Sequence, residues 1–256
     1  MDNNIATSLD QGVLQILITR PEKKNALTSE MYSAITRTLL DGEQNPDVRV
    51  MLLGGIGGNF TAGNDLGDFL QNPPSASDAP VFKFFECLAG LEKPLVAAVE
   101  GFAVGIGTTL LLHCDLVYAA PNARFILPFT SLGLSPEAGS SYLLAQRIGS
   151  AKASELILLG EPLTAEKALT LGLINDMVTE GSVMDFALAR CAKLAAQPTA
   201  AVRAAKALLK KANQPAITDA IARETEVFMR RLSSPEAKEA LTAFAEKRKP
   251  DFSRFK

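Results

Sequence analysis

The stretch GFAVGIGTT at residues 101–109 joins an apolar run at 94–99 to a second apolar run that ends at Cys114. The first run has the length and composition of a buried β-strand. The glycines that follow it let the backbone turn sharply and come close to a ligand. A short helix that begins after this turn leaves its first N–H groups without partners inside the helix. The stretch therefore predicts a strand, a glycine turn and a helix start whose N–H groups face a binding site.

A second glycine-rich segment has the same arrangement. Residues 59–66 read NFTAGNDL and follow an apolar strand predicted at 48–53. Glycine clusters commonly mark flexible connections, and this segment alone fits that interpretation equally well. Two strand-to-turn segments with exposed N–H groups suit a different task, which is to hold the oxygen of a thioester as it becomes an enolate.

Two phosphate-binding motifs are excluded in the same region. Gly105 and Gly107 could open a dinucleotide-binding fingerprint, but Leu110 stands where its third glycine would be. No glycine in the chain is followed by Lys and then Ser or Thr, as a phosphate loop requires.

The composition is that of an ordinary globular chain, with 256 residues, 47% apolar and 21% charged residues and a net charge of −2. These values argue against disorder and against nucleic acid as a partner. The uncharged stretches are shorter than the roughly 18 residues of a membrane span, and the N-terminus has no signal core. The three distant cysteines and the lone His113 exclude a multi-histidine metal site. We expect a cytoplasmic protein with reduced core thiols, no metal and no membrane partner.

Hydrophobic periodicity predicts a mixed α/β core at 1–178 and a helical C-terminal region at 179–256. The core opens with a hairpin, followed by a helix that Thr28 caps and that ends near Gly42. The strands predicted in the core lie at 4–9, 13–18, 48–53, 94–99, 116–120 and 125–127. The helices predicted in the C-terminal region lie at 183–211, 216–232 and 235–247.

A third candidate segment is SPEAGSS at residues 135–141. Ser135 is a suitable N-cap, Pro136 fits the first position of a helix, and Glu137 then lies in the first turn. A carboxylate at a helix start is commonly no more than a partner of the helix dipole. A functional role for Glu137 therefore needs support from elsewhere.

Several motifs resemble the enoyl-CoA hydratase and isomerase family, the crotonase superfamily. They are PEKKNAL at 21–27, FTAGNDL at 60–66, the segments 101–115 and 165–178, and EKRKPDF at 246–252. Together they cover nearly the whole chain in family order, so they are much more specific than any one of them. The resemblance implies a crotonase-like spiral of ββα units, a helical region for oligomerisation and pocket closure, and homotrimers or dimers of trimers.

The resemblance also assigns the oxyanion-binding groups. The two backbone N–H donors of the family fall on Asn64, which follows Ala62 and Gly63, and on Ile106, which follows Gly105. Only the backbones of Asn64 and Ile106 would act.

The hydratases of this family use two glutamates, and this chain has Thr109 and Phe129 at those positions. Neither side chain exchanges a proton near neutral pH, and each could be a pocket residue or ordinary core packing. Glu137 instead matches the single catalytic glutamate of the peroxisomal type of 3-enoyl to 2-enoyl-CoA isomerases. One carboxylate within reach of C2 and C4 can move the proton between them without water. The helix dipole would lower the pKa of Glu137, whereas an apolar pocket would raise it.

Coenzyme A would enter as part of the substrate, so no separate cofactor is expected. The resemblance places it near Lys24 and Ala26, with basic groups of the C-terminal segment approaching its phosphates. These candidates are Lys247, Arg248 and Lys256, each of which could equally be a solvated residue. A further basic stripe is expected to face solvent, and it consists of Arg203, Lys206 and Lys210.

Other functions stay open at this point. Another one-carboxylate enzyme of the superfamily, such as a ring-opening isomerase or an aryl-CoA dehalogenase, would also use the position of Glu137, and a weak hydratase activity is compatible. A non-catalytic acyl-CoA binding protein would keep the fold without the acids. A serine hydrolase is disfavoured because the chain has no G-x-S-x-G motif. His113 lies in an apolar helix and is interpreted as a core histidine with satisfied hydrogen bonds.

Overall fold

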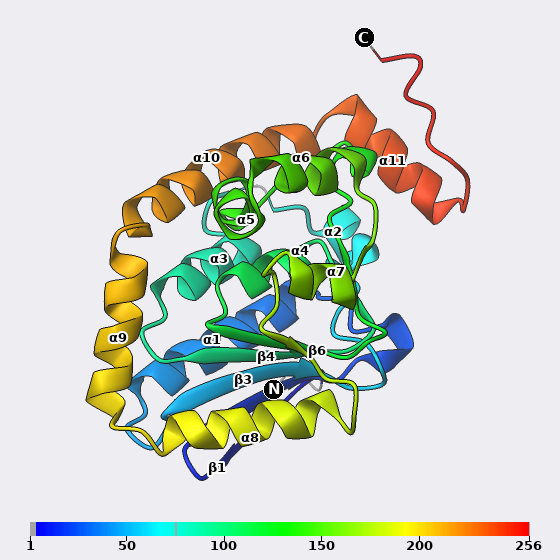
Figure 1. Cartoon of the computed structure of the whole chain (residues 1–256). Helices are drawn as coiled ribbons and strands as arrows, with labels where there is room; N and C mark the ends of the chain where they lie inside the picture. Colours follow the sequence, from blue (N-terminus) through cyan, green and yellow to red (C-terminus); the bar gives the residue numbers. More distant parts are fainter. Residues whose placement is uncertain (1–3, 75, 256) are drawn as a thin grey trace.

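The structure is a computed structural model that describes residues 4–74 and 76–255. Its centre is a six-stranded sheet with the order β1-β2-β3-β4-β6-β9 (Figure 1). The first two strands form the predicted antiparallel hairpin, with Ile5 opposite Ile18, and the other neighbours are parallel. The strands are β1 (Ile5–Asp10), β2 (Val13–Ile18), β3 (Val50–Gly55), β4 (Leu95–Val99), β6 (Leu116–Ala119) and β9 (Asp176–Met177).

A second sheet of three strands has the order β5-β7-β8. It consists of β5 (Phe102–Val104), β7 (Arg124–Ile126) and β8 (Leu163–Thr164). The chain passes from β4 to β5 and from β6 to β7 through short turns. Strands β4 and β6 pair in the large sheet, and the strands that follow them, β5 and β7, pair in the small one. This repetition is the predicted spiral of strand-strand-helix units.

Helices cover both faces of the large sheet. Side chains alternate along β3, where Met51 and Leu53 face the larger core while Val50 and Leu52 face the smaller one. Helices α1 and α3 pack on the larger core, and α8 covers the opposite face (Figure 1). The α-helices are α1 (Ser29–Gln44), α2 (Leu66–Gln71), α3 (Pro80–Gly90), α4 (Ile106–Thr109), α5 (Ser140–Ile148), α6 (Ser150–Leu159), α7 (Ala165–Thr170), α8 (Val183–Ala195), α9 (Thr199–Lys211), α10 (Gln214–Leu232) and α11 (Pro235–Ala245), and the 3₁₀ helices are η1 (Pro21–Lys23), η2 (Leu110–Leu112) and η3 (Thr130–Leu132).

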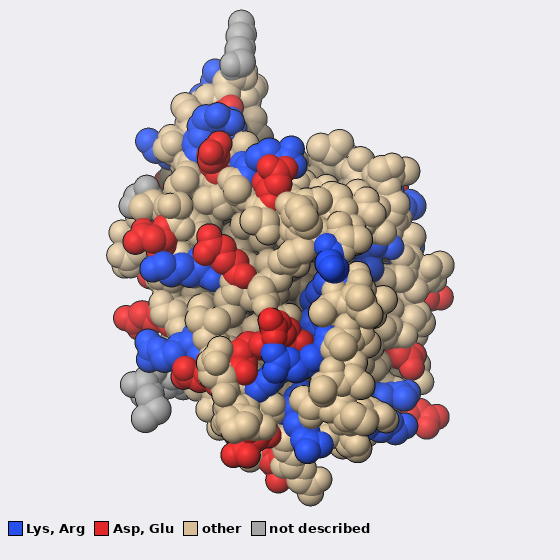
Figure 2. Space-filling view, turned by 90° about the vertical axis from the view of Figure 1, so that its left-hand side faces the viewer, with Lys and Arg blue, Asp and Glu red and all other residues tan. Residues whose placement is uncertain are grey.

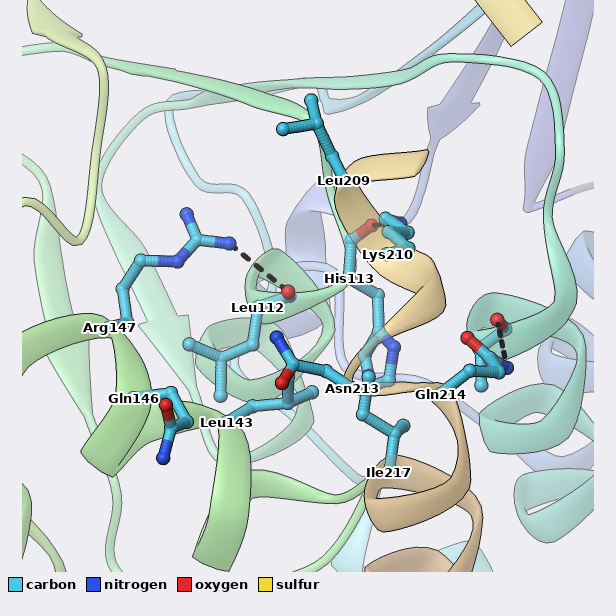
Figure 3. Close-up of a pocket in the computed structure, with 11 residues that line it drawn as sticks. Leu112, His113, Leu143, Gln146, Arg147, Leu209, Lys210, Asn213, Gln214 and Ile217 are labelled. Carbon is cyan, nitrogen blue, oxygen red and sulfur yellow. Dashed lines mark hydrogen bonds between the residues drawn. The ribbon is translucent and has the colours of Figure 1, made fainter. Parts of the chain in front are cut away.

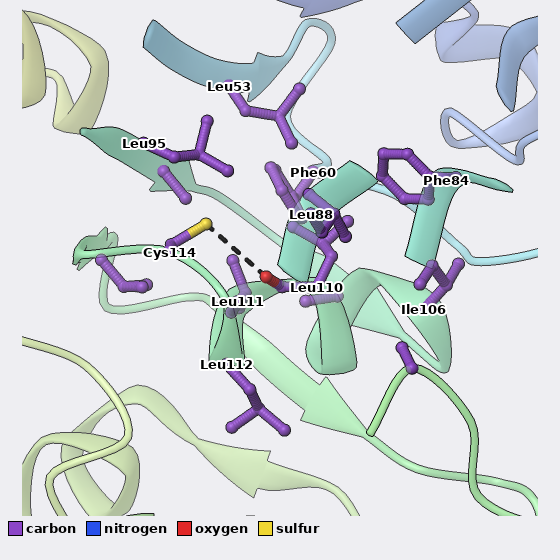
Figure 4. Packing of buried hydrophobic residues seen from close by; sticks show 14 of the residues in the cluster. Leu53, Phe60, Phe84, Leu88, Leu95, Ile106, Leu110, Leu111, Leu112 and Cys114 are labelled. Atoms are coloured by element: carbon purple, nitrogen blue, oxygen red, sulfur yellow. Dashed lines mark hydrogen bonds between the residues drawn. The ribbon is translucent and has the colours of Figure 1, made fainter. Parts of the chain in front are cut away.

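The apolar run after the glycine turn lies at the centre of the larger core. In Figure 4, Leu53 and Leu95 of the sheet and Leu88 of α3 surround η2 and Cys114. All three cysteines are buried and free, as predicted. Burial raises the pKa of Cys87 to about 11 and the pKa values of Cys114 and Cys191 to about 12, so they stay thiols. Within the described residues, no helix has the length and apolar character to cross a membrane.

Two predicted helix ends are displaced for local reasons. Helix α1 continues past Gly42 to Gln44. The glycine does not end the helix but allows close packing on β2, where an added Cβ would lie 2.8 Å from Leu14 Cδ2. The helix predicted at 183–211 is two helices, and the break lies at Pro198, which precedes α9 and has no N–H to continue a helix.

The predicted helix start at Ser135 is wrong. Helix α5 begins at Ser140, and the residues just before it are not helical and end in a turn, with Ala138 at φ 57° and Gly139 at φ 73°. A right-handed helix cannot include two successive residues in the left-handed region. Glu137 therefore lies outside the helix, and the predicted effect of the helix dipole on its pKa does not apply.

Candidate active site

The two glycine-rich segments lie side by side in the structure. Thr61 pairs with Ala103 in a parallel bridge, in which Thr61 N donates to Phe102 O (2.9 Å) and Val104 N donates to Thr61 O (3.0 Å). Close packing explains the glycine at position 63, because an added Cβ would lie 2.6 Å from Val104 O. The bridge fixes the position of each loop relative to the other.

The two predicted oxyanion donors, Asn64 and Ile106, each stand three residues beyond this bridge. Asn64 is held between two backbone bonds, from Leu27 N to Gly63 O and from Asp65 N to Leu27 O, each 2.8 Å long. Its side-chain Oδ1 accepts a hydrogen bond of 2.5 Å from Tyr32 Oη. Ile106 is the first residue of α4. Within residues 4–74 and 76–255, the backbone N–H groups of Asn64 and Ile106 donate to no protein acceptor. Both are therefore available to a ligand.

A cavity of about 760 Å³ lies in front of these two residues. Most of the predicted site residues line it, namely Lys24, Ala26, Ala62, Gly63, Asn64, Gly105, Ile106 and Phe129. Its mouth includes charged groups, whereas its inner wall is apolar and includes Phe69, Leu134 and Phe228. A polar mouth and an apolar interior suit a molecule with a charged handle and an acyl tail.

Thr109 and Glu137 do not line this cavity. The Glu137 side chain is only 3% exposed, and its Oε1 accepts a hydrogen bond of 2.5 Å from Thr109 Oγ1. Glu137 Oε2 has no hydrogen-bond partner among the residues that the structure describes. Thr109 stands on the same short helix as Ile106, so the carboxyl group and one oxyanion donor are fixed by one element.

Burial makes Glu137 a much weaker acid than an exposed glutamate. Burial raises its pKa to about 8, the nearby charge of Glu224 adds to this shift, and the bond from Thr109 opposes it. Of the two effects predicted from sequence, the apolar surroundings have the larger influence, because burial is the main cause of the raised pKa. The group can therefore change its protonation state near neutral pH.

His113 supports the turn that carries Glu137. It is buried, and its Nε2 lies 2.7 Å from Ala138 O, as a donor to that carbonyl. Burial lowers the pKa of His113 to about 4, and the cations Lys210 and Arg147 contribute to this shift. The ring also lines a second cavity of about 340 Å³, in which Arg147 reaches Leu112 O (Figure 3). The predicted core histidine is thus confirmed, and it directly contacts the turn that carries Glu137.

The predicted solvent-facing stripe on α9 is partly wrong. Lys206 is buried, and its Nζ donates to Lys93 O (2.6 Å) and to Asp115 Oδ2 (2.7 Å). Lys210 also bonds inward, to His113 O at 2.9 Å, and Arg203 pairs with Glu92 at the surface. Long basic side chains can bury their stems while the charged ends find internal partners. Figure 2 shows that Lys and Arg alternate with Asp and Glu on this side of the molecule, which therefore offers no uniform basic patch.

The basic C-terminal candidates for coenzyme A differ in their partners. Arg248 is held by Glu239 and Glu246, at 2.5 Å each, whereas Lys247 is exposed. Lys256 lies outside the described residues. Near the cavity mouth, Lys24 Nζ stands 4.8 Å from the centroid of the Phe102 ring, a cation–π contact that orients it.

Two residues near the site are missed by sequence analysis. Tyr32 occupies a core-facing position of α1, and nothing in that pattern indicates a contact with Asn64. Glu224 lies in an amphipathic helix, but its carboxylate is buried and accepts bonds from Gly139 N and Ser141 N. Both contacts join segments far apart in sequence, which a local pattern cannot predict.

Comparison with known proteins gives consistent matches over the whole chain. The profile of the enoyl-CoA hydratase/isomerase family matches residues 8–254. The chain is 32% identical over 251 residues to a 2,3-dehydroadipyl-CoA hydratase of Escherichia coli strain K12, covering 98% of each protein. It is 34% identical over 247 residues to the human enoyl-CoA delta isomerase 2, covering 94% of this chain and 62% of that protein. The solved structure of Pseudomonas aeruginosa OdaA superposes with a TM-score of 0.92 at 44% identity, over 95% of this chain and 99% of that one.

Proposed function

We propose that this protein shifts the double bond of an enoyl-CoA from position 3 to position 2. The chain belongs to the enoyl-CoA hydratase/isomerase family and acts on enoyl-CoA substrates. The observation that carries the proposal is the Glu137 carboxyl group. It is buried, has one oxygen bound by Thr109 and the other free, and has a pKa of about 8.

Substrate binding would begin at the thioester carbonyl. Its oxygen would accept hydrogen bonds from the backbone N–H groups of Asn64 and Ile106. These bonds strengthen as the oxygen gains negative charge, so they favour the dienolate over the bound substrate. Two fixed backbone donors need no reorganisation during the reaction, which is the main advantage of such a site.

The proton transfer would use Glu137 as both base and acid. Glu137 Oε2 removes a proton from C2, and the electrons of that C–H bond enter the dienolate. The protonated carboxyl group then delivers the proton to C4, which leaves the double bond between C2 and C3. No water is consumed, and Glu137 returns to its starting charge. A pKa near the working pH suits a group that must both take and return a proton.

Glu137 does not line the cavity, so its carboxyl group must reach the substrate past the residues of the wall. Two of these wall residues are close in sequence to the hydrogen-bonded pair: Ile106 precedes Thr109 by three residues, and Leu134 precedes Glu137 by three. A small shift of these wall residues on binding would open the cavity to Oε2. We expect a complex with a non-reactive acyl-CoA to have Oε2 within hydrogen-bonding reach of C2.

Water addition is less well supported because it needs two free carboxylates. Thr109 and Phe129 stand at the hydratase positions, and neither can activate water. Asp65 lines the cavity, but its Oδ2 accepts a bond of 2.6 Å from Arg20 and its Oδ1 caps α2 through Gly67 N and Asp68 N. The hydratase named among the relatives still makes this reaction the second candidate.

The coenzyme A part would lie at the charged mouth of the cavity. Lys24 is oriented there by Phe102 and can bond to phosphate, while Ala26 offers backbone groups. The handle would fix the thioester at the oxyanion donors and direct the acyl tail towards Phe129 and Phe228.

The decisive experiment compares Glu137→Gln with the wild-type protein on two substrates. Wild-type protein should convert 3-enoyl-CoA to the conjugated thioester and add water to 2-enoyl-CoA slowly or not at all. Glu137→Gln should lower kcat for isomerisation by about 100- to 10,000-fold, because general acid–base catalysis contributes about that much. Glu166→Gln is the matched control, since Glu166 is exposed on α7.

Three outcomes would contradict the proposal. Near-normal turnover by Glu137→Gln would remove the base. Faster hydration than isomerisation by the wild-type protein would favour the hydratase. Binding of both thioesters without turnover would favour a non-catalytic acyl-CoA binding protein.

A further inference from the structure

Glu224 is a second buried carboxylate close to the active-site turn. It stands on α10 and is only 7% exposed. Its Oε2 accepts a hydrogen bond of 2.6 Å from Gly139 N, and its Oε1 accepts one of 2.8 Å from Ser141 N. Buried carboxylates are costly unless such donors compensate them, so the pair of bonds fixes Glu224 in place.

The turn that Glu224 binds is the one that carries Glu137. Ala138 adopts φ 57°, a left-handed conformation that is unfavourable for a residue with a Cβ. Inside the turn, Ser140 N donates to Glu137 O at 3.1 Å. From outside, His113 holds Ala138 O and Glu224 holds Gly139 N, so the strained residue is clamped on both sides.

Glu224 accepts hydrogen bonds from two of the backbone N–H groups at the start of helix α5, those of Gly139 and Ser141. The N-cap residue of α5 is Gly139, which has no side chain to satisfy the N–H groups of the first turn. Glu224 supplies this function from a position 85 residues away. The same helix α10 carries Phe228, which lines the substrate cavity one turn further on.

We propose that Glu224 is a positioning residue of the active site, which holds the turn at 137–141 and places a second negative charge beside the catalytic carboxyl group. The assignment rests on the proposed function of Glu137 as the acid and base. The other titratable or charged groups around this turn come from several elements. They are Tyr32 from α1 with Asp68 of α2 near it, His113 after η2 with Arg147, Lys206 and Lys210 near it, and Arg223 next to Glu224 on α10. Glu224 is the group whose charge acts on Glu137, and it raises the pKa of that side chain.

The first test is the pH profile of Glu224→Gln. The amide oxygen can accept only one of the two N–H bonds, and the negative charge is lost. We expect kcat to fall about 10- to 100-fold, because small displacements of a catalytic group have effects of this size. We expect the acid limb of the kcat/KM profile to move to lower pH, with KM little changed. Glu224→Asp keeps the charge but not the reach, and should lower kcat without moving the acid limb.

The matched control is Glu239→Gln on α11. Glu239 is also 7% exposed and also binds a backbone N–H, that of Asp251 at 2.9 Å, but it pairs with Arg248 and does not line the cavity. This variant should keep the wild-type acid limb. An unmoved acid limb in Glu224→Gln, wild-type kcat in Glu224→Asp, or the same shift in Glu239→Gln would each overturn the assignment.

A second readout needs no turnover and separates this proposal from the proposed function. Glu137 binds its proton more tightly in the folded protein, so it makes the free energy of unfolding fall as pH rises from about 4.5 to 8. In Glu224→Gln this fall should end at lower pH. Burial also raises the pKa of Glu224, so Glu224→Gln removes the contribution of that group to the pH dependence as well. When both proteins also carry Glu137→Gln, only this contribution should remain of the difference. If the wild-type protein isomerises nothing but this shift is found, the coupling holds and only the function fails. If isomerisation is found without the shift, the coupling fails.

Discussion

At the scale of single residues, Thr109 determines which oxygen of Glu137 is free to accept a proton. Its hydroxyl group donates to Oε1 and favours the ionised carboxylate, which lowers the pKa of Glu137 against the effect of burial. Thr109→Val removes this bond with almost no change of shape. We expect the acid limb of the kcat/KM profile to move to higher pH, opposite to the shift expected for Glu224→Gln.

The same substitution should also lower stability at high pH. A hydrogen bond to a charged group is worth about 1.5 to 3 kcal/mol. The acceptor of this bond is charged only when Glu137 is ionised, so the variant loses the full contribution only at high pH. Thr109→Ser keeps the hydroxyl group and serves as the control. An acid limb that moves in Thr109→Ser as much as in Thr109→Val would contradict the assigned bond.

His113 should give the opposite dependence of stability on pH from Glu137. The pKa of His113 is about 4 in the folded protein and about 6.5 when unfolded, so the unfolded chain binds more protons between these values. This contribution to the free energy of unfolding is present above pH 6.5 and is lost as pH falls towards 4. In His113→Gln this rise is lost, so the slope of the measured free energy of unfolding against pH should become more negative in this range. An unchanged slope would mean that the histidine is not buried in its neutral form.

At the scale of secondary-structure elements, Phe228 of α10 forms part of the lining of the proposed substrate cavity. Phe228 packs edge-on against Phe69 of α2 and Phe82 of α3, with ring centroids 6.1 and 6.5 Å apart. Phe69 and Phe228 line the substrate cavity, and Phe82 lines another cavity of about 470 Å³ between α3 and α10. The Phe228 ring thus stands between two spaces.

Phe228→Ala should join these spaces and shift activity towards longer acyl chains. The expected measurement is a rise of kcat/KM for long relative to short 3-enoyl-CoA thioesters, at a stability cost of about 3 to 5 kcal/mol. Phe85→Ala is the matched control, because Phe85 packs on Phe82 at 5.9 Å but lines neither cavity. An identical chain-length profile in Phe228→Ala would place the end of the acyl tail elsewhere.

Elements governed by local periodicity can be predicted from this sequence, and elements governed by distant contacts cannot. The hairpin, the β4 strand and the glycine turn before α4 follow from apolar runs and glycines. The start of α5 does not, because Ser135 and Pro136 form a good local N-cap signal, while Glu224 and His113 stabilise a turn that lasts until Gly139. Lys206 likewise has a surface-like sequence position and a buried partner, Asp115.

At the scale of the whole molecule, the described surface has apolar residues that a single chain leaves uncovered. Two adjacent leucine pairs are more than half exposed, Leu158 with Leu159 on α6 and Leu208 with Leu209 on α9. Single exposed leucines are common in folded proteins, but adjacent pairs on two helices are typical of association surfaces. The family resemblance gives homotrimers or dimers of trimers as the expected assembly.

We therefore expect light scattering to give a mass that is a multiple of three chains of 27.3 kDa. Replacing both leucines of an interface pair by glutamate would bury unpaired charge, which is costly, so the assembly should dissociate in at least one of the two double variants. Leu40→Glu is the control, since Leu40 is half exposed but has no exposed leucine beside it. A wild-type mass of one chain would show that the leucine pairs face solvent. Conversely, a leucine variant could lose activity together with assembly. The cavity that Phe228 of α10 and Phe244 of α11 line would then depend on a neighbouring chain to hold those helices in place.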